Sequence, residues 1–179
     1  MARLDLAACA LFLAGCGAST LRIAVAPTID GDGHPGVEST FGVGVGTPLD
    51  FHGASHHFLQ ATGSVGGGLD GRRRTAALVT TGGLDYLYWA EPRLEVRGGL
   101  GLSYRRVGGA GAPTQLFGFG GHIGILPVVV GNASGPGAYH LCLGPELHAE
   151  WLHSDPPGAS RALLSLPLVV ELTVLTAGD

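Results

Sequence analysis

The feature that most constrains this chain is a two-residue alternation between bulky apolar side chains and very small or charged ones. It is clearest in residues 92–107, and residues 37–48, 114–130 and 138–153 repeat it. In the first of these segments the apolar positions are Leu94, Val96, Leu100, Leu102 and Tyr104, separated by glycine, serine, arginine and glutamate. Because successive side chains of a strand point to opposite faces, this alternation predicts β-strands with one apolar face and one small or charged face.

The rest of the chain shows the same organisation, and no segment after residue 16 has a sustained helical period with caps. Breaks rich in Gly, Pro and Asp separate the alternating segments, as expected for turns. The predicted strands are residues 21–27, 37–48, 56–69, 74–90, 92–107, 114–130, 138–153 and 160–176. Short connections favour antiparallel neighbours, so the sequence predicts an all-β fold, an up-and-down meander of about eight strands closed into a barrel. Pro127, Pro145 and Pro167 lie inside predicted strands and indicate bulges or edges there.

The N-terminus has the features of an export signal. An apolar run of ten residues, Leu6 to Gly15, follows Arg3, and this is about half the length needed to span a bilayer as a helix. It ends in Leu13-Ala14-Gly15-Cys16, which resembles the lipobox of bacterial lipoproteins. The resemblance implies a signal peptide at 1–15, a mature chain at 16–179 that is a single barrel domain, and an acyl chain such as palmitate on Cys16. Because Gly17 is not Asp, it also implies the outer membrane. The alternative is an ordinary cleaved signal in which Cys16 has no role.

The two faces of the predicted strands suggest which side of the barrel points inward. A small barrel has little interior room, so glycine, serine and paired charges suit the inside. Bulky apolar side chains then face lipid, and tyrosine and tryptophan fall near strand ends, as at membrane interfaces. This pattern resembles small eight-stranded outer-membrane barrels. The alternative is a soluble barrel or sandwich held at the membrane by its lipid alone.

Charge and cysteine content exclude several classes of partner and cofactor. The ten basic residues are all Arg and the net charge is -4, so the chain offers no surface for nucleic acid. Once Cys9 is removed with the signal and Cys16 carries lipid, Cys142 has no cysteine left to pair with, and no CxxC spacing is present. We expect no cofactor and no bound metal.

The inward face carries the candidate site. We expect a polar network in the lumen in which carboxylates pair with arginines; its members are Arg93, Glu95, Arg97, Arg105, Glu146, His148 and Glu150. The alternative is a metal or proton-transfer cluster, because Glu146, His148 and Glu150 share one strand face and His122 or His140 could lie nearby.

Three weaker motifs have simpler readings. Asp30-Gly31-Asp32-Gly33 resembles the opening of a calcium loop but lacks the later ligands, so we expect a plain turn. His56-His57 lacks a third metal ligand and is expected at the surface. His153 and Ser154, with Glu146, offer the residue types of a hydrolytic triad. Since adjacent strand residues face opposite sides, His153 and Ser154 can cooperate only if the chain bends there.

Together these patterns indicate a class of protein rather than a mechanism. We expect a non-enzymatic, lipid-anchored β-barrel of the cell envelope, in the outer membrane, with a structural or interaction role presented by its short loops. Its expected partner is membrane lipid, and protein partners stay open. No pore is expected, because side chains fill an eight-stranded interior. The alternatives are a lipocalin-like periplasmic lipoprotein that binds a hydrophobic ligand and an outer-membrane lipid hydrolase.

Overall fold

A computed structural model describes residues 17–49, 56–72, 75–90, 93–108, 113–132, 138–155 and 160–175. These residues form nine strands: β1 (Ala18–Asp30), β2 (Pro35–Pro48), β3 (His57–Asp70), β4 (Thr75–Ala90), β5 (Leu94–Val107), β6 (Thr114–Asn132), β7 (Tyr139–Asp155), β8 (Arg161–Ser165) and β9 (Leu168–Leu175). Within these ranges no helix is long and apolar enough to cross a membrane. The predicted signal peptide at 1–15 and Cys16 lie outside the described residues.

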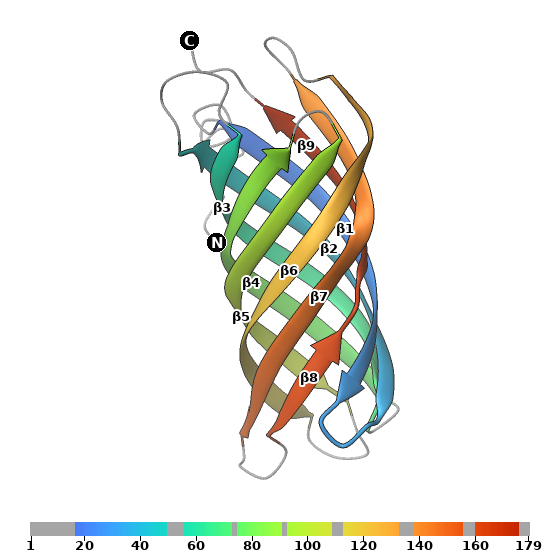
Figure 1. The fold of residues 1–179 in the computed structure, drawn as a ribbon. Helices are drawn as coiled ribbons and strands as arrows, with labels where there is room; N and C mark the ends of the chain where they lie inside the picture. Colours follow the sequence, from blue (N-terminus) through green and yellow to red (C-terminus); the bar gives the residue numbers. More distant parts are fainter. Residues whose placement is uncertain are drawn as a thin grey trace, which may run out of the picture.

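The strands close into one antiparallel barrel (Figure 1). Each strand from β1 to β7 pairs with the next, with 12 to 14 registered pairs for most neighbours. The last strands, β8 and β9, pair with β7 on one side and with β1 on the other, and this closes the circle. The all-β meander and the closed barrel predicted from the sequence are therefore confirmed.

The eighth barrel strand differs from the prediction of one continuous segment at 160–176. It is split into β8 and β9 at Leu166 and Pro167, because proline has no amide hydrogen for the ladder. Single backbone bonds bridge the break on both sides. The Leu166 amide donates to the Pro27 carbonyl at 3.2 Å, and the Glu146 amide donates to the Pro167 carbonyl at 3.0 Å.

A second irregularity follows Pro127 in β6. The register between β6 and β7 runs regularly to Gly124↔Glu146, resumes at Val128↔Cys142 and then shifts by one residue between Val128 and Val130. Such a bulge is the expected response to a proline within a strand. Pro127 and Pro145 thus lie within continuous strands, and the ladder is irregular beside them.

The outer face of the wall is apolar and the inner face is not. Leu100, Leu102 and Phe119 are about 60% exposed or more, although they lie in the middle of long strands. Among the outward-facing strand side chains that the structure describes, Arg106, at the end of β5, is the one Asp, Glu, Arg or Lys. This orientation is the reverse of a water-soluble barrel, in which the apolar face would be enclosed.

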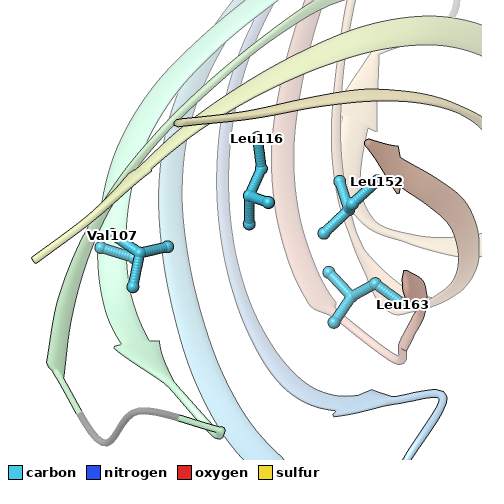
Figure 2. Close-up of a cluster of buried hydrophobic side chains, with 5 residues drawn as sticks. Val107, Leu116, Leu152 and Leu163 are labelled. Atoms are coloured by element: carbon cyan, nitrogen blue, oxygen red, sulfur yellow. The ribbon is translucent and has the colours of Figure 1, made fainter. Parts of the chain in front are cut away.

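Small apolar clusters lie inside the barrel towards both ends. Towards the turn that connects β7 to β8, the cluster comprises Ala77, Val107, Leu116, Leu152 and Leu163, four of which are labelled in Figure 2. Towards the opposite end it comprises Ala18, Phe58, Leu87 and Trp89. The ion pairs of Arg97 and Arg105 lie between these two clusters, and Arg161 pairs with Asp70 at the end of the barrel where β3 ends.

Candidate functional site, the charged lumen

The charged side chains of the barrel wall are directed inward by the same alternation that directs the apolar ones outward. Between the two apolar clusters, the described inward positions carry three arginines, Arg22, Arg97 and Arg105. They also carry six carboxylates: Glu38, Asp85, Glu95, Glu146, Glu150 and Glu171. The lumen is therefore strongly polar, and its carboxylates outnumber its guanidinium groups.

Arg97 is the centre of the larger group of ion pairs. It is 2% exposed, and its Nη2 lies 3.1 Å from Glu95 Oε1 and 2.5 Å from Glu171 Oε1. Its Nη1 lies 3.8 Å from Glu146 Oε1 and 4.0 Å from Asp85 Oδ2. Four strands, β4, β5, β7 and β9, are thus joined through one guanidinium group. A buried guanidinium needs such partners because it cannot lose its proton.

Neighbouring polar groups hold the carboxylates around Arg97. Trp89 Nε1 donates to Glu95 Oε2 at 3.0 Å, and Thr173 Oγ1 donates to Glu171 Oε1 at 3.1 Å. Arg22 of β1 donates to Glu146 Oε2. These bonds orient the carboxylate oxygens before they meet the guanidinium, as expected for a rigid buried network.

Arg105 forms the second group, nearer the turn between β7 and β8. Its Nε and Nη2 donate to the two carboxylate oxygens of Glu38 at 3.0 and 3.1 Å, which is the two-pronged geometry that makes arginine–carboxylate pairs strong. Its Nη1 donates to Glu150 and, at 2.9 Å, to Ser103 Oγ. Arg105 therefore joins β5 to β2 and β7 across the lumen.

Two histidines lie beside these groups. The rings of His122 and His148 stack with centroids 4.9 Å apart. His148 Nε2 lies 2.7 Å from Glu146 Oε2, and His122 Nε2 lies 3.4 Å from Asp85 Oδ2. Both rings line a cavity of about 120 Å³, together with Arg22, Arg97 and Arg105.

The predicted network residues are mostly found together, with one exception. Glu95, Arg97, Arg105, Glu146, His148 and Glu150 all point into the lumen and contact one another or a shared partner. Arg93 does not, because β5 begins at Leu94 and Arg93 lies in the preceding turn with an exposed side chain. The prediction began that strand at residue 92 and so placed Arg93 on the inner face.

Sequence reasoning missed four members of the network: Arg22, Glu38, Asp85 and Glu171. Glu38 lies on the small-residue face of the predicted strand at 37–48, beside glycines 42, 44 and 46 of that face, but the predicted network does not include it. Asp85 lies on a strand whose alternation is interrupted by the Gly82-Gly83 pair. The signal that identifies Arg22, Asp85 and Glu171 is their sequence neighbours, since each lies between two outward-facing apolar or aromatic residues.

The alternative chemistry of the weaker motifs is not assembled. Among the described residues, the group with ligand atoms close enough for a metal ion is Asp30, Asp32 and His34, at the turn after β1. Asp30 Oδ1 there accepts hydrogen bonds from the Asp32 and His34 amides at 3.1 and 2.8 Å, which is turn chemistry. Glu146, His148 and Glu150 do not meet that criterion.

The residue types of a hydrolytic triad are also separated. Ser154 is fully buried, and His153 is exposed on the outer face, where its Nδ1 lies 3.0 Å from Ser160 Oγ. The two side chains lie on opposite sides of the wall, as the strand period requires. His57, at the start of β3, likewise faces outward and contacts Tyr86 Oη at 2.6 Å.

Comparison with known proteins gives a likeness of fold. No protein-family model matches the chain, and no curated protein matches its sequence. The barrel resembles Neisserial surface protein A. Its crystal structure superposes with a TM-score of 0.55 at 15% identity, over 89% of this chain and 97% of that one. A chain from the de novo design of transmembrane β-barrels aligns over the same shares, with a TM-score of 0.40 at 18% identity.

The likeness to Neisserial surface protein A establishes the architecture. Two chains that share 15% of their residues have the same small antiparallel barrel over nearly their full lengths. The described barrel of this chain therefore resembles an eight-stranded outer-membrane barrel, as predicted. The function has to be argued from this chain's own faces and charges.

Proposed function

We propose that this chain is an integral β-barrel of the bacterial outer membrane, with a closed lumen and a non-enzymatic, structural or interaction role. The observation that carries the proposal is the outer face of the wall. Every strand presents at least one leucine, isoleucine, valine or phenylalanine on this face, and Arg106 is its one described charged residue. In water such a continuous apolar surface would aggregate, whereas in a bilayer it is the surface that lipid chains require.

The dimensions of this face fit a bilayer. On β4 the outward side chains run from Leu78 to Tyr88 without a charged residue. Ten residues of strand, tilted as in small barrels, span about 25 Å along the barrel axis, which matches the apolar band of outer-membrane barrels. Tyr86, Tyr88 and Tyr139 are exposed at one end of the wall, and Tyr104 lies near the other. Aromatic residues at both ends are the usual interfacial arrangement.

The interior supports a closed barrel rather than a channel or a ligand cavity. Ion pairs cross its middle, and apolar clusters lie towards both ends. A lipocalin-like protein needs its apolar face around an internal cavity, and here that face is outside. The short connections at both ends leave the turns and the outer wall as the surfaces that a partner or lipid would meet.

The lipid anchor is the second part of the proposal, supported by the sequence Leu13-Ala14-Gly15-Cys16. A barrel that spans the bilayer would hold the chain in the membrane whether or not Cys16 carries lipid. This predicts that the two attachments can be separated experimentally.

The test replaces residues 1–16 by an ordinary cleaved signal without cysteine and follows the protein through an alkaline wash of the membranes. A barrel that spans the bilayer stays in the membrane pellet, with or without Cys16. The full-length chain with Cys16→Ser is the matched control for lipidation itself. Release of a folded, soluble domain from the washed membranes would refute the membrane-spanning proposal.

A further inference from the structure

The outer wall has a hollow at the end of β3, β4 and β5 that faces away from the chain termini. Its volume is about 500 Å³, and its lining includes Gly66, Gly67, Ala76, Leu78, Arg106 and Pro113. Gly67, Leu78 and Arg106 lie side by side across the three strands, as the register pairs Gly67↔Leu78 and Leu78↔Arg106 show. The absence of a side chain at Gly67 leaves the space beside Leu78 open.

Arg106 differs from the other arginines of the barrel strands. Arg22, Arg97, Arg105 and Arg161 point inward and each contacts a carboxylate. Arg106 points outward, is exposed, and makes no ion pair or hydrogen bond with the residues that the structure describes. Its charge is therefore available to an anion from outside the barrel.

The depth of Arg106 follows from the proposed membrane position. An outward arginine costs about 2–4 kcal/mol at the bilayer midplane and close to nothing at the interface, so Arg106 belongs at the level of the headgroups. Tyr104, two residues nearer the middle of β5, packs against Phe117 with ring centroids 5.3 Å apart. Aromatic residues gather just inside that level. The hollow therefore has a charged rim at headgroup depth and an apolar lining below it.

We propose that this hollow binds a phosphate-bearing lipid, with the Arg106 guanidinium donating to the headgroup phosphate and an acyl chain lying over Leu78 and Gly67. The proposal rests on the proposed function, since it needs the barrel in a bilayer. A guanidinium group matches phosphate oxygens with two parallel hydrogen bonds. The apolar lining favours an amphiphile over a free inorganic ion.

A second copy of the chain fits the hollow less well than a lipid. Its outer wall would have to supply the anion for Arg106, and the outward strand side chains that the structure describes include no carboxylate. A phospholipid supplies both the anion and the apolar chain in one molecule.

The experiment measures binding of phosphatidylglycerol to the full-length barrel by native mass spectrometry from a detergent that contains no phosphate. The wild type should retain one lipid more tightly than the rest, and Arg106→Gln should weaken that binding about fivefold, the effect of one interfacial cation. Gly67→Leu fills the hollow while keeping the charge, and should weaken binding as well. The matched control is Arg72→Gln, which removes an exposed arginine at the same end of the barrel. Arg72 Nη1 lies 3.4 Å from Asp32 Oδ2, outside the hollow, so this variant should leave lipid binding unchanged.

Three results would overturn the proposal. Equal binding by wild type and Arg106→Gln would show that Arg106 does not contact the headgroup. Equal retention of diacylglycerol, which has no phosphate, would show that only the acyl chain is recognised. Displacement of the lipid by inorganic phosphate would assign the site to the free ion. Failure of the membrane proposal is distinguishable, because it appears as release of the cysteine-free barrel in the alkaline wash, whether or not that barrel binds phosphatidylglycerol.

Discussion

Arg97 should be the most costly single side chain to remove from the lumen. Its guanidinium lies within 4.0 Å of oxygens from four carboxylates, at 2.5, 3.1, 3.8 and 4.0 Å. With an effective dielectric constant of about 20, each contact corresponds to roughly 4–7 kcal/mol of gross attraction. The cost of burying the charges offsets most of this sum. Removal of one partner from a buried ion pair therefore costs about 3–5 kcal/mol, chiefly because the other partner is left unpaired.

The perturbation is Arg97→Met, which keeps the length of the side chain and removes the charge. The barrel is refolded into zwitterionic vesicles and unfolded with urea, with tryptophan fluorescence and gel mobility as readouts. Trp89 is a suitable reporter because it is buried and its indole donates to Glu95, beside Arg97. We expect the free energy of unfolding to fall by about 3–5 kcal/mol.

Two further variants make the test specific. Arg72→Met removes an exposed arginine just after β3, whose ion pair with Asp32 lies at the surface, and should change the free energy of unfolding by less than about 1 kcal/mol. The double variant Arg97→Met with Glu171→Gln removes a partner charge as well and should recover part of the loss. The reasoning is wrong if Arg97→Met and Arg72→Met unfold at the same urea concentration, or if the double variant is less stable than the single one.

Three more predictions concern the wall and its chemistry. Leu100→Arg, on the outer face in the middle of β5, should lower the free energy of unfolding of the barrel in vesicles by about 2–4 kcal/mol. Gln115→Arg, near the end of β6, should lower it by less than about 1 kcal/mol. Equal urea midpoints for the two variants would show that the apolar face does not contact lipid. Gly66→Ala puts a Cβ against backbone atoms of β2 and should lower the free energy of unfolding by about 1–3 kcal/mol. The Cβ of Gly63→Ala, which faces outward on the same strand, would meet a single atom at 3.7 Å, so this variant should be the more stable of the two. The opposite order in thermal unfolding would contradict tight packing of the inner face. The purified barrel should release no fatty acid from vesicles above background, and Ser154→Ala should release the same amount. Release by the wild type that is lost in Ser154→Ala would support the lipid-hydrolase alternative.

The barrel could be predicted from the sequence because nearly every strand alternates bulky apolar side chains with small or charged ones. Seven of the eight barrel strands were predicted as continuous segments that match the structure to within a few residues. The exception is the eighth strand. Pro167 indicates an irregularity there, but the effect of this proline depends on which neighbouring strands can replace the missing ladder bond. Here Pro27 and Glu146 do so from β1 and β7. That information is a property of the closed barrel and not of the local sequence.

The candidate site was predicted less completely, for a physical reason. Alternation tells which residues face the lumen, but partner choice depends on the stagger of the strands around the barrel. Arg97 meets Glu171, 74 residues away, and Arg105 meets Glu38, 67 residues away. Local patterns therefore identified Arg97, Arg105 and Glu95 but did not pair them with β2 or β9. The prediction for Arg93 was wrong for a local reason, because Arg93 lies in the turn before β5 and not in the strand.

The arrangement of the lumen also limits where an activity of this protein can reside. The ion pairs join strands on different sides of the barrel: β5 to β9 through Arg97, β5 to β2 through Arg105, and β1 to β7 through Arg22. Opening a path through such a lumen would separate several buried charges at once, at a cost of several kcal/mol for each ion. Thermal fluctuations do not supply the energy to break all of these ion pairs together, so the ion pairs hold the strands of the wall in fixed positions. A lipid or a partner must then be recognised at the turns or on the outer face, and Arg106 is the described residue of that face whose charge the fold itself leaves unused.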